Sequence, residues 1–228
     1  MKIGIIAAME QELRILVEHL THTHQTVKAN QNFYEGQLMN HDVVLVQSGI
    51  GKVNASIAAT LLIEVFKVDA VINTGSAGGI GSGLSVGDLV LSKELSYNDA
   101  DSRAFGYQFG QIPQMPERYA ADEDLISLFI KAAESKWTIK KGLIVTGDSF
   151  ISNKDKINAI KNYFPDALVT EMEGAAIAQT CYQFGIPFLV IRAVSDVADE
   201  EASLTFDEFI ELAGKKSAET VLSFIENS

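Results

Sequence analysis

Seven short apolar runs constrain the fold of this chain more than any other feature of its sequence. Polar residues do not alternate with apolar ones inside these runs, which indicates strands buried on both faces of a sheet. The runs cover residues 3–8, 43–48, 70–74, 89–92, 142–146, 167–170 and 188–194. Strands of this kind need other elements on both faces of the sheet to cover them.

Helical patterns lie between many of these runs, because apolar residues recur there every three or four positions. They occur at Leu13, Leu16, Val17 and Leu20; at Val53, Ile57, Leu61 and Val65; at Ile177, Cys181 and Phe184; and from Phe206 to Glu226. Strands that alternate with helices predict a three-layer α/β/α domain with a central mixed, largely parallel sheet. The chain has 228 residues, 47% of them hydrophobic, and no linker divides it, so we expect a single domain over residues 1–228.

The charge and the cysteine content narrow the classes of partner and the cell compartment. A formal net charge of -12 disfavours binding to nucleic acids and to anionic membranes, although a neutral nucleoside stays compatible with it. Cys181 is the one cysteine, so no intrachain disulfide is expected, which fits a reducing compartment. The N-terminal apolar run is too short to span a bilayer, and Glu10 and Glu12 follow it at once. These features predict a cytoplasmic location.

Three carboxylates follow predicted strands at the points where those strands end. Glu12 comes after the run 3–8, Glu173 after 167–170 and Asp196 after 188–194. In open α/β sheets, ligands bind beyond the carboxyl ends of the strands. We therefore expect these three side chains to face one ligand pocket, with Arg192 supporting it from within the last strand.

Each carboxylate also has a purely structural interpretation. Glu12 lies where a helix dipole favours negative charge, and Thr170 with Glu173 fits a capping box. Asp196 fits the cap of a turn or of a short helix. Taken singly these residues favour the structural roles, whereas three carboxylates at three strand ends favour a ligand site. Glu171 is a weaker candidate, since two residues away from Glu173 it need not face the same way.

Two glycine-rich loops follow predicted strands. The first, G49-I-G-K52, lacks the third glycine of a dinucleotide-binding fingerprint and the Ser or Thr of a Walker A loop. The second, T74-G-S-A-G-G79, either brings N–H groups and the Ser76 hydroxyl to an anion, water or sugar hydroxyls, or is a structural turn. None of the four arginines lies in these loops and Lys52 is the one nearby cation, which disfavours phosphate as co-substrate.

No metal site is predicted. Three of the four histidines crowd the segment H19-L-T-H-T-H24, which we interpret as a solvated helix end. The chain has neither an H-E-x-x-H motif nor a pair of cysteines, and nothing in it resembles a nucleophile elbow.

Several ordered stretches resemble one bacterial enzyme family. They are I3-G-I-I-A-A-M-E-Q-E12, N73-T-G-S-A-G-G79, the run from Phe105 to Pro113, G147-D-S-F-I151, E171-M-E-G-A-A-I-A178 and R192-A-V-S-D196. Together they resemble the 5′-methylthioadenosine/S-adenosylhomocysteine nucleosidases, a branch of the nucleoside phosphorylase superfamily, along essentially the whole chain.

The resemblance implies a nucleoside phosphorylase-like fold and a homodimer. It also implies hydrolysis of adenine nucleosides modified at the 5′ carbon, as a step of methionine salvage. Water would be the second substrate, and no cofactor would be needed. Glu12 would activate water, Asp196 would protonate nitrogen 7 of adenine, and Glu173 would bind the ribose hydroxyls. The further substrate-binding residues implied are Met9, Ser76, Gly78, Phe150, Ile151, Met172, Ser195 and Phe206, with Phe105 and Pro113 supplied by the partner subunit.

Rival functions remain at this point. A related phosphorylase would consume phosphate, another hydrolase would take a different purine nucleoside, and a binding module on the same fold would hold a nucleoside without cleaving it. The incomplete glycine fingerprint makes a nicotinamide oxidoreductase the weakest rival. The preferred 5′ substituent, including whether 5′-deoxyadenosine is a substrate, stays open.

Overall fold

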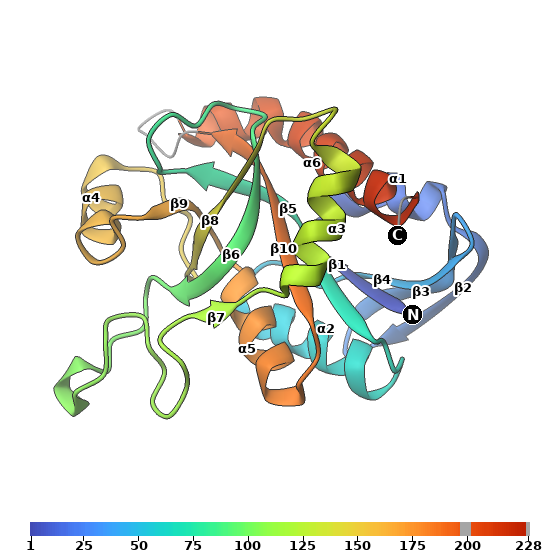
Figure 1. Ribbon diagram of the computed structural model, residues 1–228, viewed down its shortest axis with the longest axis horizontal. Helices are drawn as coiled ribbons and strands as arrows, with labels where there is room; N and C mark the ends of the chain where they lie inside the picture. Colours follow the sequence, from blue (N-terminus) through green and yellow to red (C-terminus); the bar gives the residue numbers. More distant parts are fainter. Residues whose placement is uncertain (197–201, 227–228) are drawn as a thin grey trace.

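The computed structural model describes residues 1–196 and 202–226, except for the side chains of residues 202–208 (Figure 1). Its strands are β1 (Ile3–Ala7), β2 (Thr21–Lys28), β3 (Gln31–Leu38), β4 (His41–Gln47), β5 (Ala70–Gly79), β6 (Leu89–Tyr97), β7 (Tyr119–Ala120), β8 (Ile139–Thr146), β9 (Ala167–Glu171) and β10 (Phe188–Asp196). Its helices are α1 (Glu10–Glu18), α2 (Lys52–Glu64), the short 3-10 helix η1 (Arg103–Phe105), α3 (Glu123–Ala133), α4 (Lys154–Tyr163), α5 (Gly174–Phe184) and α6 (Ala202–Glu226). All seven predicted strands and all four predicted helices are present.

The described strands form one mixed sheet in the order β10-β6-β8-β9-β5-β1-β4-β3-β2, with β7 paired to β6. Five of the pairings are parallel and five are antiparallel. The α/β class with a mixed sheet is therefore confirmed. Strands β1 and β10 are buried along their whole length, as their largely apolar runs predicted.

Strand β10 pairs with both β5 and β6, so five strands (β5, β9, β8, β6 and β10) form a closed ring within the sheet. Strands β5 and β9 run antiparallel and pair only near their carboxyl ends, where Gly78 lies opposite Thr170 and Gly79 opposite Val169. This crossing brings the carboxyl end of β9 to the carboxyl ends of β1, β5 and β10, which are mutually parallel. The fold thereby gathers the predicted ligand-binding strand ends in one place.

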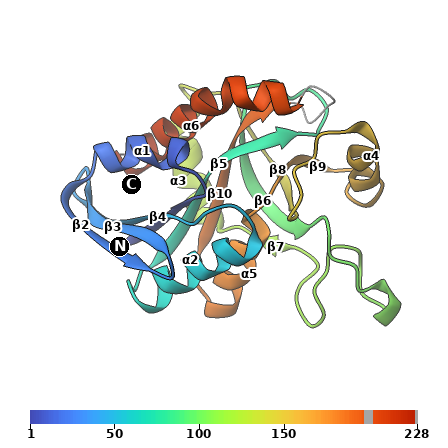
Figure 2. The same ribbon diagram turned by 180° about the vertical axis from the view of Figure 1, so that it is seen from behind.

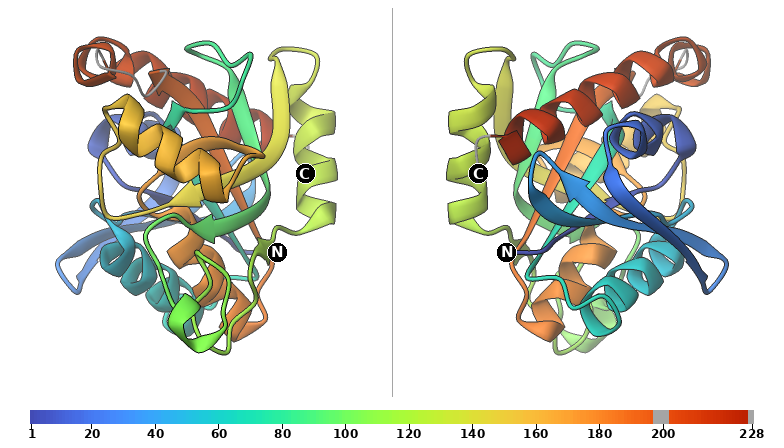
Figure 3. Two further views of the ribbon diagram at one scale, coloured as in Figure 1. Left: turned by 90° about the vertical axis from the view of Figure 1, so that its left-hand side faces the viewer. Right: turned by 90° about the vertical axis from the view of Figure 1, so that its right-hand side faces the viewer.

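Helices cover the sheet on opposite sides (Figures 2 and 3). Helix α6 packs on β5 and β10 and contacts α1 and α3. Helices α2 and α5 contact each other on the far side of the central strands. None of the described helices combines the length and the apolar character that a membrane span requires.

Two details of the predicted elements need correction. The segment of histidines ends a helix only at His19, the C-cap of α1; His22 and His24 instead lie in the edge strand β2, so the helix-end interpretation is wrong for them. Helix α2 exists, but Val53 is exposed and the buried face carries alanines and Leu62 instead. Of the four-residue repeat, Val53 and Val65 are exposed and Leu61 is partly buried against the core, so the repeat does not mark the most buried face of the helix.

Candidate active site

A cavity of about 350 Å³ lies where the carboxyl ends of β1, β5, β9 and β10 meet. Its lining residues are Ala8, Met9, Glu12, Ile50, Ser76, Ala77, Gly78, Phe150, Thr170, Glu171, Met172, Glu173, Arg192, Ser195 and Asp196. A wider and more open hollow of about 650 Å³ lies over β2–β4 and is lined by Lys2, His22, His24 and Glu35 among others. The first cavity is the better ligand site, because its lining is largely apolar and its few polar groups converge.

Glu12 lies both at the N-terminus of helix α1 and in the wall of the cavity, so both of its predicted positions are found. It is the third residue of α1, and its Oε2 accepts hydrogen bonds from the N–H groups of Ala8 at 3.1 Å and Met9 at 3.2 Å. Its Oε1 accepts from the N–H of Ser76 at 2.9 Å and from the Ser76 hydroxyl at 3.0 Å. The side chain is 1% exposed, so these four donors hold a buried carboxylate in one orientation at the cavity wall.

Gly75 leaves space for the side chains of Arg192 and Glu12, which both lie against its backbone. A Cβ atom at this position would overlap Arg192 Nη1 and would lie 2.8 Å from Glu12 Oε1. Glycine is therefore needed here for space rather than for an unusual backbone angle.

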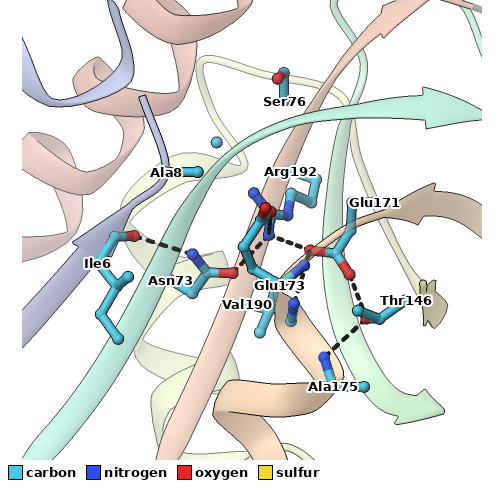
Figure 4. A network of polar contacts seen from close by, with 12 residues as sticks. Ile6, Ala8, Asn73, Ser76, Thr146, Glu171, Glu173, Ala175, Val190 and Arg192 are labelled. Atoms are coloured by element: carbon cyan, nitrogen blue, oxygen red, sulfur yellow. Dashed lines mark hydrogen bonds and ion pairs between the residues drawn. The ribbon is translucent and has the colours of Figure 1, made fainter. Parts of the chain in front are cut away.

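A buried ion network centred on Arg192 lies at the wall of the cavity (Figure 4). Its Nη2 donates to Asn73 Oδ1 at 2.7 Å, forms an ion pair with Glu171, and lies 3.4 Å from Glu173 Oε2. The Asn73 side chain also donates to the carbonyl of Ile6 at 3.0 Å. Arg192 thus connects β10 to β1, β5 and β9, which agrees with the supporting position expected for it.

Glu171, and not Glu173, caps α5. Glu171 Oε2 accepts hydrogen bonds from the N–H groups of Glu173 at 3.0 Å and Gly174 at 2.8 Å, while Oε1 accepts one from the Thr146 hydroxyl. Glu173 occupies the N-cap position but makes no side-chain cap bond, so the capping box of Thr170 and Glu173 is wrong. Because Glu171 satisfies the helix N-terminus, the side chain of Glu173 is available to the cavity.

The environment of Glu173 raises its pKa to about 7. Burial is the largest cause, and the neighbouring Glu171 and Glu12 raise the pKa further. The ion pair with Arg192 and the hydrogen bond from the Gly51 N–H at 2.9 Å oppose this shift. Glu173 therefore changes its protonation state near neutral pH.

Asp196 is the last residue of β10, is 1% exposed, and lies opposite Gly78 in the register of β5. The Ser195 hydroxyl donates to its Oδ2 at 2.9 Å. Its alternative role as a helix cap concerns residues 197–201, which lie outside the described part of the chain.

Apolar side chains complete the cavity. Met9, Met172 and Phe150 lie in its wall, and Ile151 lines a small hollow next to it, beside Gly78 and Asp196. Ile50, from the loop after β4, also contributes, although no sequence pattern had singled it out.

Besides Ile151, which lines only the neighbouring hollow, three more predicted residues are not among the described residues of this lining. Phe105 is 82% exposed on η1, and neither it nor Pro113 lines the cavity of its own chain. Phe206 belongs to α6, but its side chain lies outside the described part.

Asn73 and Thr146 are functional candidates that the sequence patterns did not select, whereas Glu171 was considered only as a weaker candidate for the ligand pocket. The signal was nonetheless present for Asn73 and Thr146, since each is a polar residue in or at the end of an apolar strand run. A polar side chain buried in such a strand must find a hydrogen-bonding partner. For these residues the partners are other site residues: Arg192 for Asn73 and Glu171 for Thr146.

Comparison with known sequences places residues 2–226 in one family, the phosphorylase superfamily, and the chain belongs to it. The chain is 52% identical over 226 residues, 99% of either sequence, to the 5′-methylthioadenosine/S-adenosylhomocysteine nucleosidase of Staphylococcus carnosus. The same nucleosidase from Streptococcus pneumoniae, solved with a transition-state inhibitor, superposes with a TM-score of 0.96 at 47% identity, covering 100% of this chain and 99% of that one. The Neisseria meningitidis nucleosidase, in complex with methylthio-immucillin-A, gives 0.98 at 44% identity, with coverages of 100% and 99%.

Proposed function

We propose that this chain hydrolyses the N-glycosidic bond of 5′-methylthioadenosine and S-adenosylhomocysteine, releasing adenine and the 5-substituted ribose. One observation carries the proposal: Glu12, Glu173 and Asp196, from three separate strand ends, line a single largely apolar cavity. The activity named for relatives about half identical over the full chain supports the same substrates.

The reaction needs two carboxyl groups in opposite protonation states. Breaking the bond leaves electron density on the purine and an oxocarbenium-like sugar, as in glycoside hydrolysis. Asp196 donates a proton to the purine, which makes it a better leaving group, and Glu12 accepts a proton from the attacking water. The four donors on Glu12 hold its carboxyl group in one orientation at the cavity wall.

Glu173 binds the ribose hydroxyls, which are hydrogen-bond donors for a carboxylate. Its Oε1 is oriented by the Gly51 N–H and its Oε2 lies near Arg192. Phe150 stacks on adenine and Met172 packs on the ribose, since both lie in the apolar wall of the cavity.

Water is favoured over phosphate as the second substrate. Arg192 is the one cation among the described lining residues, and it is already engaged by Asn73, Glu171 and Glu173. Incubation with 5′-methylthioadenosine is expected to release adenine and free 5-methylthioribose at the same rate with and without phosphate. Chromatographic product analysis tests this, with 5′-deoxyadenosine as a further substrate. A sugar 1-phosphate formed only with phosphate would instead identify a phosphorylase and overturn the role of Glu12.

Glu173→Gln is expected to lower kcat/KM most above pH 7 and to flatten the pH dependence between pH 5 and pH 8. In the unmodified chain Glu173 ionises as pH rises through about 7 and becomes the stronger acceptor for the ribose hydroxyls.

The same variant should change how stability depends on pH. Since the pKa of Glu173 is raised from 4.5 to about 7, the folded state binds more protons than the unfolded state between these values. The contribution of Glu173 to stability therefore falls as pH rises through this window. The free energy of unfolding of the variant, compared with that of the unmodified chain, should therefore be on the order of 1–3 kcal/mol more favourable at pH 8 than at pH 5, because only the unmodified chain loses this contribution.

Initial rates from pH 5 to pH 8, with thermal unfolding at both ends of that range, measure these two effects. A loss of stability on the order of 1 kcal/mol with intact activity would instead assign Glu173 a structural role, through its hydrogen bond from the Gly51 N–H, and not ribose binding.

We also propose a cytoplasmic homodimer in which Phe105 and Pro113 of one protomer line the cavity of the other. The 82% exposure of Phe105 and the exposed side chain of Ile50, which lines the cavity, support this assembly. A finer description of the fold, as a single three-layer α/β/α domain over residues 1–228 with a largely parallel centre, is supported by the helices on opposite sides of the sheet and by the parallel series β4-β1-β5-β10.

A further inference from the structure

We propose that Lys52 is a positioning residue that fixes two loops of the site. The loop 49–52 holds Glu173, which binds the ribose, and the loop 147–151 carries Phe150, which stacks on adenine. Lys52 fixes both loops through Asp99 and Asp148, outside the cavity lining. The identity of the substrate rests on the proposed function, whereas the positioning role rests on contacts within the chain.

Lys52, Asp99 and Asp148 form a closed cluster that joins three segments. The Lys52 Nζ donates to both carboxylate oxygens of Asp99 at 2.8 Å and lies 3.5 Å from Asp148 Oδ2. The Lys52 N–H donates to Asp148 Oδ1 at 2.9 Å, and the Asp148 N–H donates to Asp99 Oδ2 at 2.9 Å. The lysine of the glycine loop is thus paired with two aspartates.

The cluster reaches Glu173 through the residue before Lys52. The Gly51 N–H donates to Glu173 Oε1 at 2.9 Å, so two consecutive N–H groups at the start of α2 hold Glu173 and Asp148. Gly51 has a φ of 99°, and a Cβ there would lie 3.2 Å from Asp148 Oδ1. The tight turn therefore depends on glycine and on the aspartate beside it.

The cluster reaches Phe150 through the loop after β8. Asp148 stands two residues before Phe150, and the Gly147 N–H donates to the carbonyl of Glu171 at 3.1 Å. Asn98, next to Asp99, donates through its side chain to the Thr170 hydroxyl at 2.9 Å. The loop that carries Phe150 is consequently held from both sides by the 98–99 segment and by Lys52.

Removing the ammonium group would leave two carboxylates facing each other without a cation. The side chains of Lys52, Asp99 and Asp148 are 25%, 32% and 50% exposed, so solvent screens the effect on global stability. The ring of Tyr97 also faces the lysine, with its centroid 5.3 Å from Nζ. The expected result is loosening of two loops without unfolding of the chain.

Lys52→Met is expected to raise KM for 5′-methylthioadenosine at least about tenfold, with a smaller change in kcat and little change in Tm. Lys52→Arg restores the charge and should recover most of the affinity. The matched control is Lys2→Met, which removes an ion pair of similar exposure, 3.3 Å from Glu35, at the amino end of β1. This control should leave KM unchanged.

Hydrogen exchange of the ligand-free variants tests the role independently of any activity. Exchange of the amides in 49–52 and 147–151 should rise in Lys52→Met but not in Lys2→Met. Unchanged exchange in both segments would overturn the positioning role, whatever the substrate is. A lower kcat together with a lower Tm in Lys52→Met, neither of them recovered in Lys52→Arg, would make Lys52 a purely structural residue. Absence of adenine release by the unmodified chain would count against the proposed function alone.

Discussion

Asp196→Asn is expected to lower kcat about 10²–10⁴-fold, the range that a positioned general acid contributes. The amide keeps the size and the hydrogen-bonding shape of the side chain but has no proton to transfer to the purine. The Ser195 hydroxyl, which donates to Asp196 Oδ2, still finds an acceptor in the amide oxygen. The fold should therefore stay intact, and release of adenine together with thermal unfolding measures both quantities.

Asp69→Asn is the control for this variant. Asp69 accepts a hydrogen bond from the N–H of Lys2 at 2.7 Å, at the opposite end of the sheet from the cavity. It should have unmodified activity. Turnover of Asp196→Asn within a few fold of the unmodified chain would remove Asp196 from the role of acid.

Glu12→Gln is expected to lower kcat over a similar range of about 10²–10⁴-fold, because the amide cannot accept a proton from water. Its stability should fall only by about 1 kcal/mol. A glutamine has one oxygen acceptor, whereas the two oxygens of Glu12 accept four hydrogen bonds, two from the start of α1 and two from Ser76. Some capping is thus lost together with the chemistry.

Glu10→Gln separates these two contributions. Glu10 lies in the same first turn of α1, is exposed, and does not line the cavity. Its replacement reports the effect of charge at the helix N-terminus without touching the reacting groups. If Glu12→Gln showed only the stability loss and kept its rate within tenfold, Glu12 would be a helix cap and no base.

The buried strands were predictable because complete burial leaves a contiguous apolar signature in each of them. Strand β2 was not, since nearly all its side chains are exposed and it is held by backbone hydrogen bonds to β3. Its sequence, T21-H-T-H-Q-T-V-K28, shows no apolar face, because the strand lies at the edge of the sheet. Helices α3 and α4 were not singled out either, although Asp122 and Asn153 cap them through their side chains.

The positions of the three carboxylates followed from a rule about strand ends, and the cavity does gather them. The division of labour between Glu171 and Glu173 did not follow from any local pattern. Both are buried and both face Arg192, and only the direction of the Thr146 hydroxyl and the helix N–H groups separates the capping residue from the cavity residue. Contacts between segments that are far apart in the chain decide such assignments.

Gly75 contributes no functional group and would be passed over in a search for reactive side chains. The space that a side chain would fill at this position is occupied by Arg192 and by the carboxylate of Glu12. The site therefore depends on the absence of a side chain at Gly75. In a scan of single substitutions, Gly75 should tolerate replacement as poorly as Glu12 and Asp196 do.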